Sequence, residues 1–313
     1  MISASPLPKI IYDWREIMDG KWPTKWFDID LDMVISFSLY EKARLGLGIT
    51  TPESFSKIIN ISGYYGYGFD DGYSKYGGAL RVKTSEYTHI SAKYDNTITE
   101  IGEWDSVTQR PIYDSRRFLA SRFNRTQHYS FTYVSDKNGF KWTTNALLGR
   151  ISAFYDYSFN ERNSFVNSQF TIGMKYQYKS NSSIILNRRI HTNRGYPEFM
   201  TSLTKGIKGI LGSDFDFLKL NIGIQQTFYA QNLGTTSYHV MGGFLNKSLP
   251  LGLLYEGRGS YDKSIPLIIK DHFQTIRPYE YTHDRFVFLF MRHTFDHLFS
   301  KSKFSPFAHC TSE

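Results

Sequence analysis

The chain has 313 residues, of which 41% are hydrophobic and 17% aromatic, and its Lys and Arg exceed its Asp and Glu by 37 − 29 = 8. Its mean hydropathy of −0.39 and its longest uniformly apolar run, Phe286 to Met291, exclude a helical membrane protein, whose spans need about 18 apolar residues. The basic residues are scattered, so no nucleic-acid partner is expected. Cys310 is the only cysteine, which excludes an intrachain disulfide and a cysteine-based zinc site.

The N-terminal part of the chain predicts a linker followed by a sheet. Residues 1–30 are expected to lead into a β-barrel domain at 31–313, and a helix-like patch covers Lys9 to Met18. Met1 to Pro6 lack the basic and apolar regions of a signal peptide. An outer-membrane protein needs such a leader, so a membrane location predicts that this chain is part of a longer one. The first strand is expected at Glu41 to Thr50.

The stretch from Ser56 to Tyr94 predicts an antiparallel meander. Apolar and polar residues alternate from Ile58 to Phe69, and the alternation resumes after Asp70-Asp71-Gly72 and after Thr84-Ser85-Glu86. A period of two gives strands with one apolar and one polar face, joined here by tight polar turns. Soluble strands usually have about five or six residues, whereas tilted membrane-crossing strands need about 9–11. The expected fold class is therefore all-β, an antiparallel transmembrane β-barrel of the meander type.

The remaining elements extend this pattern to about a dozen strands. Residues 97–126 are polar and rich in Arg, and we expect them to form a long surface loop. A hairpin turn is expected at Asp136 to Gly139. The later strands are expected at Trp142–Phe159, Phe165–Tyr178, Leu218–Gln225, Tyr238–Phe244 and Arg285–Phe295.

The alternation divides the strand residues between two faces. The residues expected to face lipid are Ile59, Ile61, Leu80, Val82, Leu218, Leu220, Ile222 and Ile224. The residues expected to line the interior are Asn60, Ser62, Gly66, Lys75, Arg81, Asn221 and Gln225. The period alone does not say which face is outward, because a soluble barrel with an apolar lumen alternates in the same way.

No motif in the chain predicts a metal site, a cofactor or a catalytic residue. His293-Thr294-Phe295-Asp296-His297, near His309, lacks the Glu of a helical HExxH site, and on a strand its two His would lie roughly 13 Å apart. Gly63 to Gly68 lacks the Lys-Ser/Thr of a phosphate-binding loop. The carboxylates Asp214 and Asp216 are read as solvated rim charges, and no G-x-S-x-G nucleophile elbow is present.

Two groups of segments carry a resemblance to a known family. The first group is Tyr40–Gly48, Gly63–Asp71 and Lys75–Gly77; the second is Tyr196–Pro197, Gly206–Gly209, Phe217–Leu220, Gly242–Phe244, Leu249–Leu254 and His283–Phe286. Together they resemble an uncharacterised family of Gram-negative outer-membrane proteins. In that family a carboxypeptidase-like regulatory domain precedes a β-barrel similar to the surface-antigen, BamA-like superfamily.

The resemblance implies a non-enzymatic outer-membrane β-barrel with a role in envelope assembly, secretion or transport. Its partners would be outer-membrane lipid and other envelope proteins. The family's barrels continue past the position of Phe304, so we expect this barrel to be truncated at its C-terminal end. Unpaired strand edges in lipid cost several kcal/mol per backbone group. The sheet is therefore expected to close on fewer strands, to be completed by another chain, or to remain an incomplete fragment.

Two other functions stay open at this point. The first is a soluble all-β binding module with an apolar core, in which Ile222→Arg would be as damaging as in a membrane barrel. The second is an outer-membrane hydrolase that uses His293 or His297 with acidic residues at the rim. Partition into lipid vesicles separates the first from a membrane barrel, and turnover of lipid or sugar esters tests the second.

Overall fold

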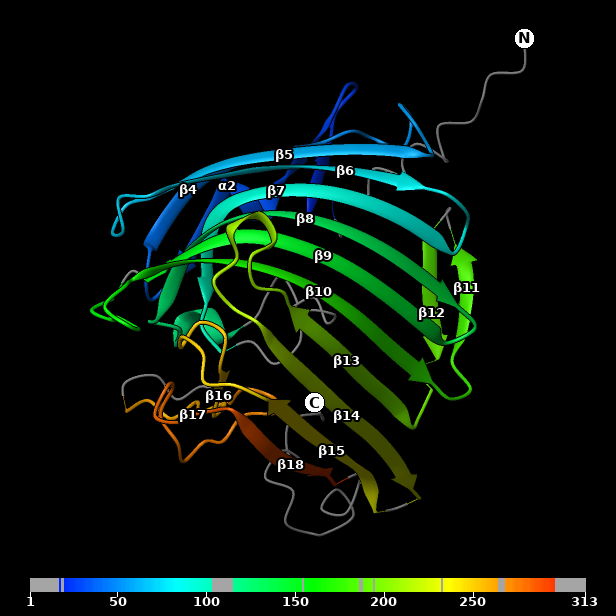
Figure 1. The fold of residues 1–313 in the computed structure, drawn as a ribbon. Coiled ribbons are helices and arrows are strands. Elements are labelled where there is room, and N and C mark those ends of the chain that lie inside the picture. The colour runs from blue at the N-terminus through cyan, green and yellow to red at the C-terminus, as the bar shows by residue number, and fades with distance from the viewer. Residues whose placement is uncertain are drawn as a thin grey trace, which may run out of the picture.

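A computed structural model of the chain describes residue 17 and residues 20–102, 115–153, 155–185, 188–193, 195–231, 233–263 and 268–295. Strands dominate these residues, and fourteen of them pair into one strongly curved sheet (Figure 1). Every pairing between neighbouring strands of this sheet is antiparallel. The predicted all-β antiparallel meander is therefore confirmed.

The elements are bounded as follows. The sheet contains β1 (Lys21–Pro23), β2 (Asp28–Asp30), β3 (Ile35–Ser38), β4 (Lys42–Thr50), β5 (Ile59–Gly68), β6 (Ser74–Lys83), β7 (Thr88–Glu100), β8 (Phe123–Lys137), β9 (Phe140–Ala153), β10 (Ser164–Gln177), β13 (Glu198–Gly206), β14 (Phe217–Ala230), β15 (Gly234–Leu245) and β18 (Arg285–Thr294). Two separate strand pairs are β11 (Asn181–Ile185) with β12 (Arg188–Asn193), and β16 (Tyr255–Glu256) with β17 (Thr282–His283). The helical elements are α2 (Leu31–Val34) and the short 3-10 turns η1 (Ser115–Phe118) and η2 (Ile210–Gly212). In the described part of the chain, no helix has the length and apolar character to cross a membrane.

The strand order follows the chain, from β1, β2 and β4 at one end to β15 and β18 at the other, and β3 also pairs with β4. The central strands are long, since β7, β8, β9, β10 and β14 have 13, 15, 14, 14 and 14 residues. Strands of soluble domains usually have about five or six residues. Each of these central strands is therefore longer than the roughly 9–11 residues that a membrane crossing needs.

The pairing register carries each face of the sheet from strand to strand. One face includes the paired row Ile61, Leu80, Ala92, Phe131, Ala146, Phe170, Lys205 and Leu218. The opposite face includes the paired row Ser62, Ala79, Lys93, Ser130, Leu147, Gln169, Gly206 and Phe217. Side chains of the second face from β7 to β14 line a single cavity, so we call this face concave and the first face convex.

Residues 246–263 and 268–284, between β15 and β18, cover part of the concave face, and we call them the strap. Tyr255 of the strap donates a hydrogen bond from Oη to Asn221 Oδ1 at 2.6 Å, and the backbone N of Leu251 donates to Tyr157 Oη at 3.0 Å. The apolar core lies under the strap and is formed by Met200, Phe217, Met241, Leu245, Leu249, Tyr255 and Phe286. The concave face is therefore filled over these strands by residues of the chain itself.

Several boundaries differ from those predicted. The loop expected at 97–126 is shorter, because β7 runs to Glu100 and β8 begins at Phe123. Its described part lies only partly at the surface, since Arg116, Leu119 and Ala120 are buried whereas Phe118, Ser121 and Arg122 are exposed. The strand expected to reach Phe159 ends at Ala153.

At the N-terminal end, β1 and β2 lie within the predicted linker 1–30 and join the sheet. The helix-like patch at Lys9–Met18 lies outside the described residues except for Ile17. Strand β13 was not predicted. Its convex face carries Thr201 and Lys205, while its concave face carries Met200, so the apolar and polar positions do not alternate cleanly.

Candidate functional site

The residues predicted to face lipid share the convex face. Among the eight, Ile59, Ile61, Leu80, Ile222 and Ile224 are exposed, with exposed fractions from 36% to 50%. The other three, Val82, Leu218 and Leu220, are half-buried. Many further apolar side chains on this face are exposed, including Leu45, Leu47, Tyr129, Phe131 and Phe170. The convex face of the sheet is thus a broad apolar surface.

The seven residues predicted to line the interior share the concave face. Gly66, Lys75, Asn221 and Gln225 are buried, Asn60 and Ser62 are half-buried, and Arg81 is exposed. They do not form one site. Lys75 belongs to a charged cluster at the end of β5 and the beginning of β6, while Asn221 bonds to the strap and to Ser202.

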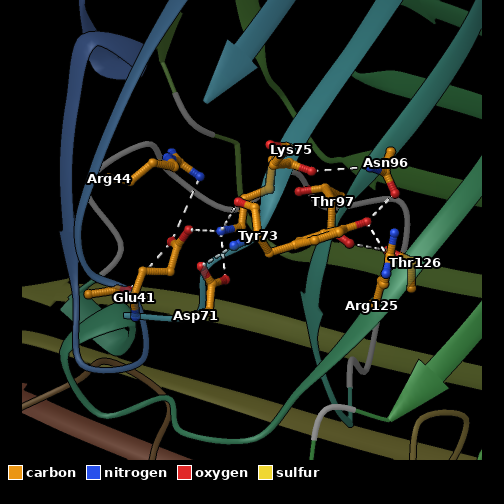
Figure 2. A network of polar contacts seen from close by, with 11 residues as sticks. Glu41, Arg44, Asp71, Tyr73, Lys75, Asn96, Thr97, Arg125 and Thr126 are labelled. Carbon is orange, nitrogen blue, oxygen red and sulfur yellow. Dashed lines mark hydrogen bonds and ion pairs between the residues drawn. The ribbon is translucent and has the colours of Figure 1, made fainter. Parts of the chain in front are cut away.

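The cluster around Lys75 pairs a buried cation with two carboxylates (Figure 2). The Lys75 side chain is 1% exposed, and its Nζ lies 2.5 Å from Glu41 Oε1 and 2.7 Å from Asp71 Oδ2. Gly68 on β5 leaves room for it, because a Cβ at that position would lie 2.7 Å from Lys75 Nζ. Arg44 Nη1 lies 3.8 Å from the second oxygen of Glu41. These ion pairs therefore hold the β5–β6 turn against the beginning of β4.

The same turn is fastened to β7 and β8 through Tyr73. Its hydroxyl donates to Asn96 Oδ1 and accepts a hydrogen bond from Arg125 Nε at 2.6 Å (Figure 2). The Arg125 guanidinium also lies 4.2 Å from the centre of the Tyr73 ring, within the range of a cation–π contact. These contacts explain why Tyr73, in the turn before β6, and Asn96, on β7, are buried.

A second buried cluster attaches the strap to the sheet. Arg116 donates from Nε to Glu100 Oε1 at 2.7 Å and from Nη2 to Glu256 Oε2 at 2.8 Å. Tyr279 of the strap donates from Oη to Glu100 Oε1 at 2.6 Å and from its backbone N to Glu256 Oε1 at 3.1 Å. Burial and the charge of Glu100 raise the pKa of Tyr279, so its hydroxyl remains a donor at neutral pH. We call Glu100, Arg116, Glu256 and Tyr279 the strap latch.

A further polar contact joins the strap to β15. His239 Nδ1 lies 3.0 Å from Asp271 Oδ2. Burial alone would raise the pKa of Asp271, but the hydrogen bond and charge of His239 outweigh it and lower that pKa. The adjacent His272 is half-buried. Its burial, together with the positive charges of Arg258 and Arg116, lowers its pKa to about 3 from 6.5.

We expect the strap to loosen as the pH falls from about 6.5 towards 3. Unfolded His272 takes up a proton below its ordinary pKa of 6.5, whereas docked His272 does so only near 3. Stability falls with decreasing pH wherever the unfolded state binds more protons, so acid favours release of the strap. Hydrogen exchange at 268–283, corrected for the intrinsic pH dependence of exchange, is expected to speed up between pH 7.5 and 4.5.

The variant His272→Gln tests whether His272 itself causes this pH dependence, rather than its charged neighbours Arg258, Arg116, Lys270 and Asp271. Because the Gln side chain cannot be protonated, hydrogen exchange of the strap should lose most of its pH dependence between pH 6.5 and 4. The contribution of Asp271 remains, because its lowered pKa acts below its ordinary value of 3.8. Identical pH dependence in the variant and in the unchanged protein would assign the effect elsewhere.

The His cluster of the sequence does not form a metal site in the described residues. Both ring nitrogens of His293 have partners, since Nδ1 lies 2.8 Å from Thr236 Oγ1 and Nε2 lies 3.1 Å from Leu233 O. His297 and His309 lie outside the described residues. Over the ranges that the structure describes, no group of three or more His, Cys, Asp or Glu side chains could hold a metal ion.

Part of the chain matches a known protein family. Residues 113–302, more than half of the chain, match the model of a family described as a family of unknown function (DUF5686), C-terminal domain. No curated protein matches the sequence. The expectation of an uncharacterised family is thereby met, while that description says nothing of a membrane or of a surface antigen.

Proposed function

We propose, from the premise that the chain belongs to the DUF5686 C-terminal domain family, that it is a non-enzymatic β-barrel protein of the Gram-negative outer membrane. The single observation that carries this proposal is the apolar convex face of a sheet whose strands are long enough to cross a bilayer. Ile61, Phe131 and Ile222 are exposed there at 50%, 54% and 48%. An outward apolar band around a polar interior is the pattern of outer-membrane barrels.

The alternative of a soluble binding module explains this surface less well. Monomeric soluble proteins rarely expose a contiguous apolar patch larger than a few hundred Å². In a soluble module the apolar face would form the core, whereas here the buried concave face carries Asp95, Asn167, Thr171 and Asn221. Lipid on the convex face accounts for both observations.

The strap on the concave face helps to choose among the possible roles in envelope assembly, secretion and transport. The strap occupies the concave face of the later strands and is fixed there by the strap latch. A wide aqueous channel would require this segment to leave. Among envelope assembly, secretion and transport, we therefore favour a role in which the barrel is a docking and assembly element rather than an open pore.

Partition into vesicles tests the proposal. The full chain would be refolded in the presence of phosphatidylcholine–phosphatidylglycerol vesicles and separated by flotation. We expect it to float with the lipid, to resist extraction by carbonate, and to migrate differently on a gel before and after boiling. Recovery as a stable monomer in buffer without detergent or lipid would contradict the proposal and favour the soluble module.

A further inference from the structure

A partly open cavity with a mixed polar and apolar lining lies between the strap and the concave face of the sheet. Its volume is about 480 Å³, within the range of roughly 300–1,000 Å³ that is common for small-molecule sites. Its walls come from β7, β8, β9, β10, β13 and β14, and Gly252 and Leu253 of the strap cover it. None of the residues singled out for the interior except Asn221 belongs to this cavity.

The cavity contains a buried hydrogen-bond acceptor that has no partner. Asn167 lines it and is 1% exposed; its Nδ2 donates to Gln169 Oε1 at 2.9 Å, while its Oδ1 has none. An unsatisfied buried carbonyl is costly, and such groups in folded proteins usually bond to protein, water or ligand. A ligand that enters the cavity and donates an O–H or N–H to this oxygen would be favoured.

The charged side chains of the concave face that line the cavity already have partners in the protein. Asp95 accepts a hydrogen bond from Tyr64 Oη at 3.0 Å and lies 2.6 Å from Lys93 Nζ and 3.3 Å from His128 Nε2. Glu100 is held by Arg116, while Lys219 Nζ lies 3.4 Å from Leu253 O and 4.3 Å from the centre of the Tyr255 ring. The cavity therefore offers neither a free carboxylate pair for a cation nor a cluster of unpaired cations for a phosphate.

Much of the remaining lining consists of hydroxyl, amide and apolar groups. Thr97, Thr99, Thr126 and Thr204 provide hydroxyl groups, and Gln169 and Asn221 provide amides. Apolar surface comes from Leu147, Ile151, Phe217 and Leu253. Amides and hydroxyls beside apolar side chains suit a molecule with many hydroxyls and a C–H face.

We propose that this cavity binds a neutral, hydroxyl-rich ligand of the carbohydrate class, of the size of a mono- or disaccharide, with a ligand hydroxyl donating to Asn167 Oδ1. The inference goes beyond the membrane assignment and does not depend on it, since the cavity is formed by the concave face and the strap alone. Binding and membrane insertion can therefore fail separately.

Titration calorimetry on the full folded chain tests the inference. The panel is glucose, galactose, N-acetylglucosamine, maltose and lactose, with glycyl-glycine and inorganic phosphate as probes of other chemistry. The detergent must have no sugar headgroup, because a maltoside would compete. We expect saturable binding of at least one sugar and a loss of at least tenfold in affinity in Asn167→Leu.

The matched control is Asn145→Leu, which changes the same residue type on the same face of the sheet but outside the cavity, where Asn145 bonds to Thr132. It should leave sugar affinity unchanged. If Asn167→Leu does not fold, Gln169→Leu is the second cavity variant and should also weaken binding. Absence of saturable sugar binding, binding of phosphate or dipeptide alone, or equal losses in Asn145→Leu would each overturn the inference.

Discussion

Ile222→Arg is expected to prevent the chain from assembling in vesicles. Ile222 lies on the convex face of β14, and a charged side chain on the lipid face of a barrel costs about 2–4 kcal/mol near the bilayer midplane. A cost of 2 kcal/mol or more reduces an equilibrium by more than tenfold. The fraction of chains that floats with vesicles and shows a heat-modifiable gel mobility is expected to fall accordingly.

The matched control is Ile268→Arg. Ile268 is an exposed isoleucine in the strap, at 73%, and lies outside the strands of the sheet. Its replacement should not change flotation. If Ile222→Arg floated as well as the unchanged protein, the convex face would not contact lipid, and the membrane proposal would be lost.

Because Ile222 is exposed, the Ile222→Arg experiment distinguishes a membrane barrel from a soluble module. From the sequence, Ile222→Arg appeared equally damaging in a soluble module, because Ile222 would then belong to an apolar core. In the structure Ile222 is 48% exposed, so a soluble protein would tolerate Arg there and gain solubility. The two functions now predict opposite results for one substitution.

The alternation of apolar and polar residues along the chain predicted the strands in which that alternation is regular. β5, β6 and β14 were expected because each places branched or aromatic side chains on every second residue between tight turns. β13 was missed because Thr201 and Lys205 stand at convex positions, where the pattern would require apolar residues. Periodicity fails where a strand mixes the two classes on one face.

Long-range partners could not be predicted in the same way. Lys75 is expected to face the interior, but nothing local indicates that the distant Glu41 would join the nearby Asp71 beside it. Arg116 and Glu256 are 140 positions apart in the chain and meet only because the strap returns across the sheet. The one available signal was the Arg-rich stretch 97–126, whose length suggested a function but not a partner.

The second large effect is expected at the strap latch. Arg116→Met removes the cation that lies between Glu100 and Glu256, whose side chains are 3% and 4% exposed. Breaking a buried ion pair from one side typically costs about 3–5 kcal/mol, because the remaining charge is left uncompensated. We expect the midpoint of thermal unfolding to fall and hydrogen exchange in the strap to accelerate strongly.

Two further variants identify uncompensated charge as the cause. Arg162→Met removes a surface pair with Asp214 at 2.9 Å, and because the Arg162 side chain is 56% exposed, its loss should cost only about 0–1 kcal/mol. The triple variant Glu100→Gln, Arg116→Met, Glu256→Gln removes all three charges and should recover much of the lost stability, since a buried ion cluster can often be replaced without net cost. If the triple variant were as unstable as Arg116→Met, the latch would act through the shape and packing of Arg116 rather than through its charge.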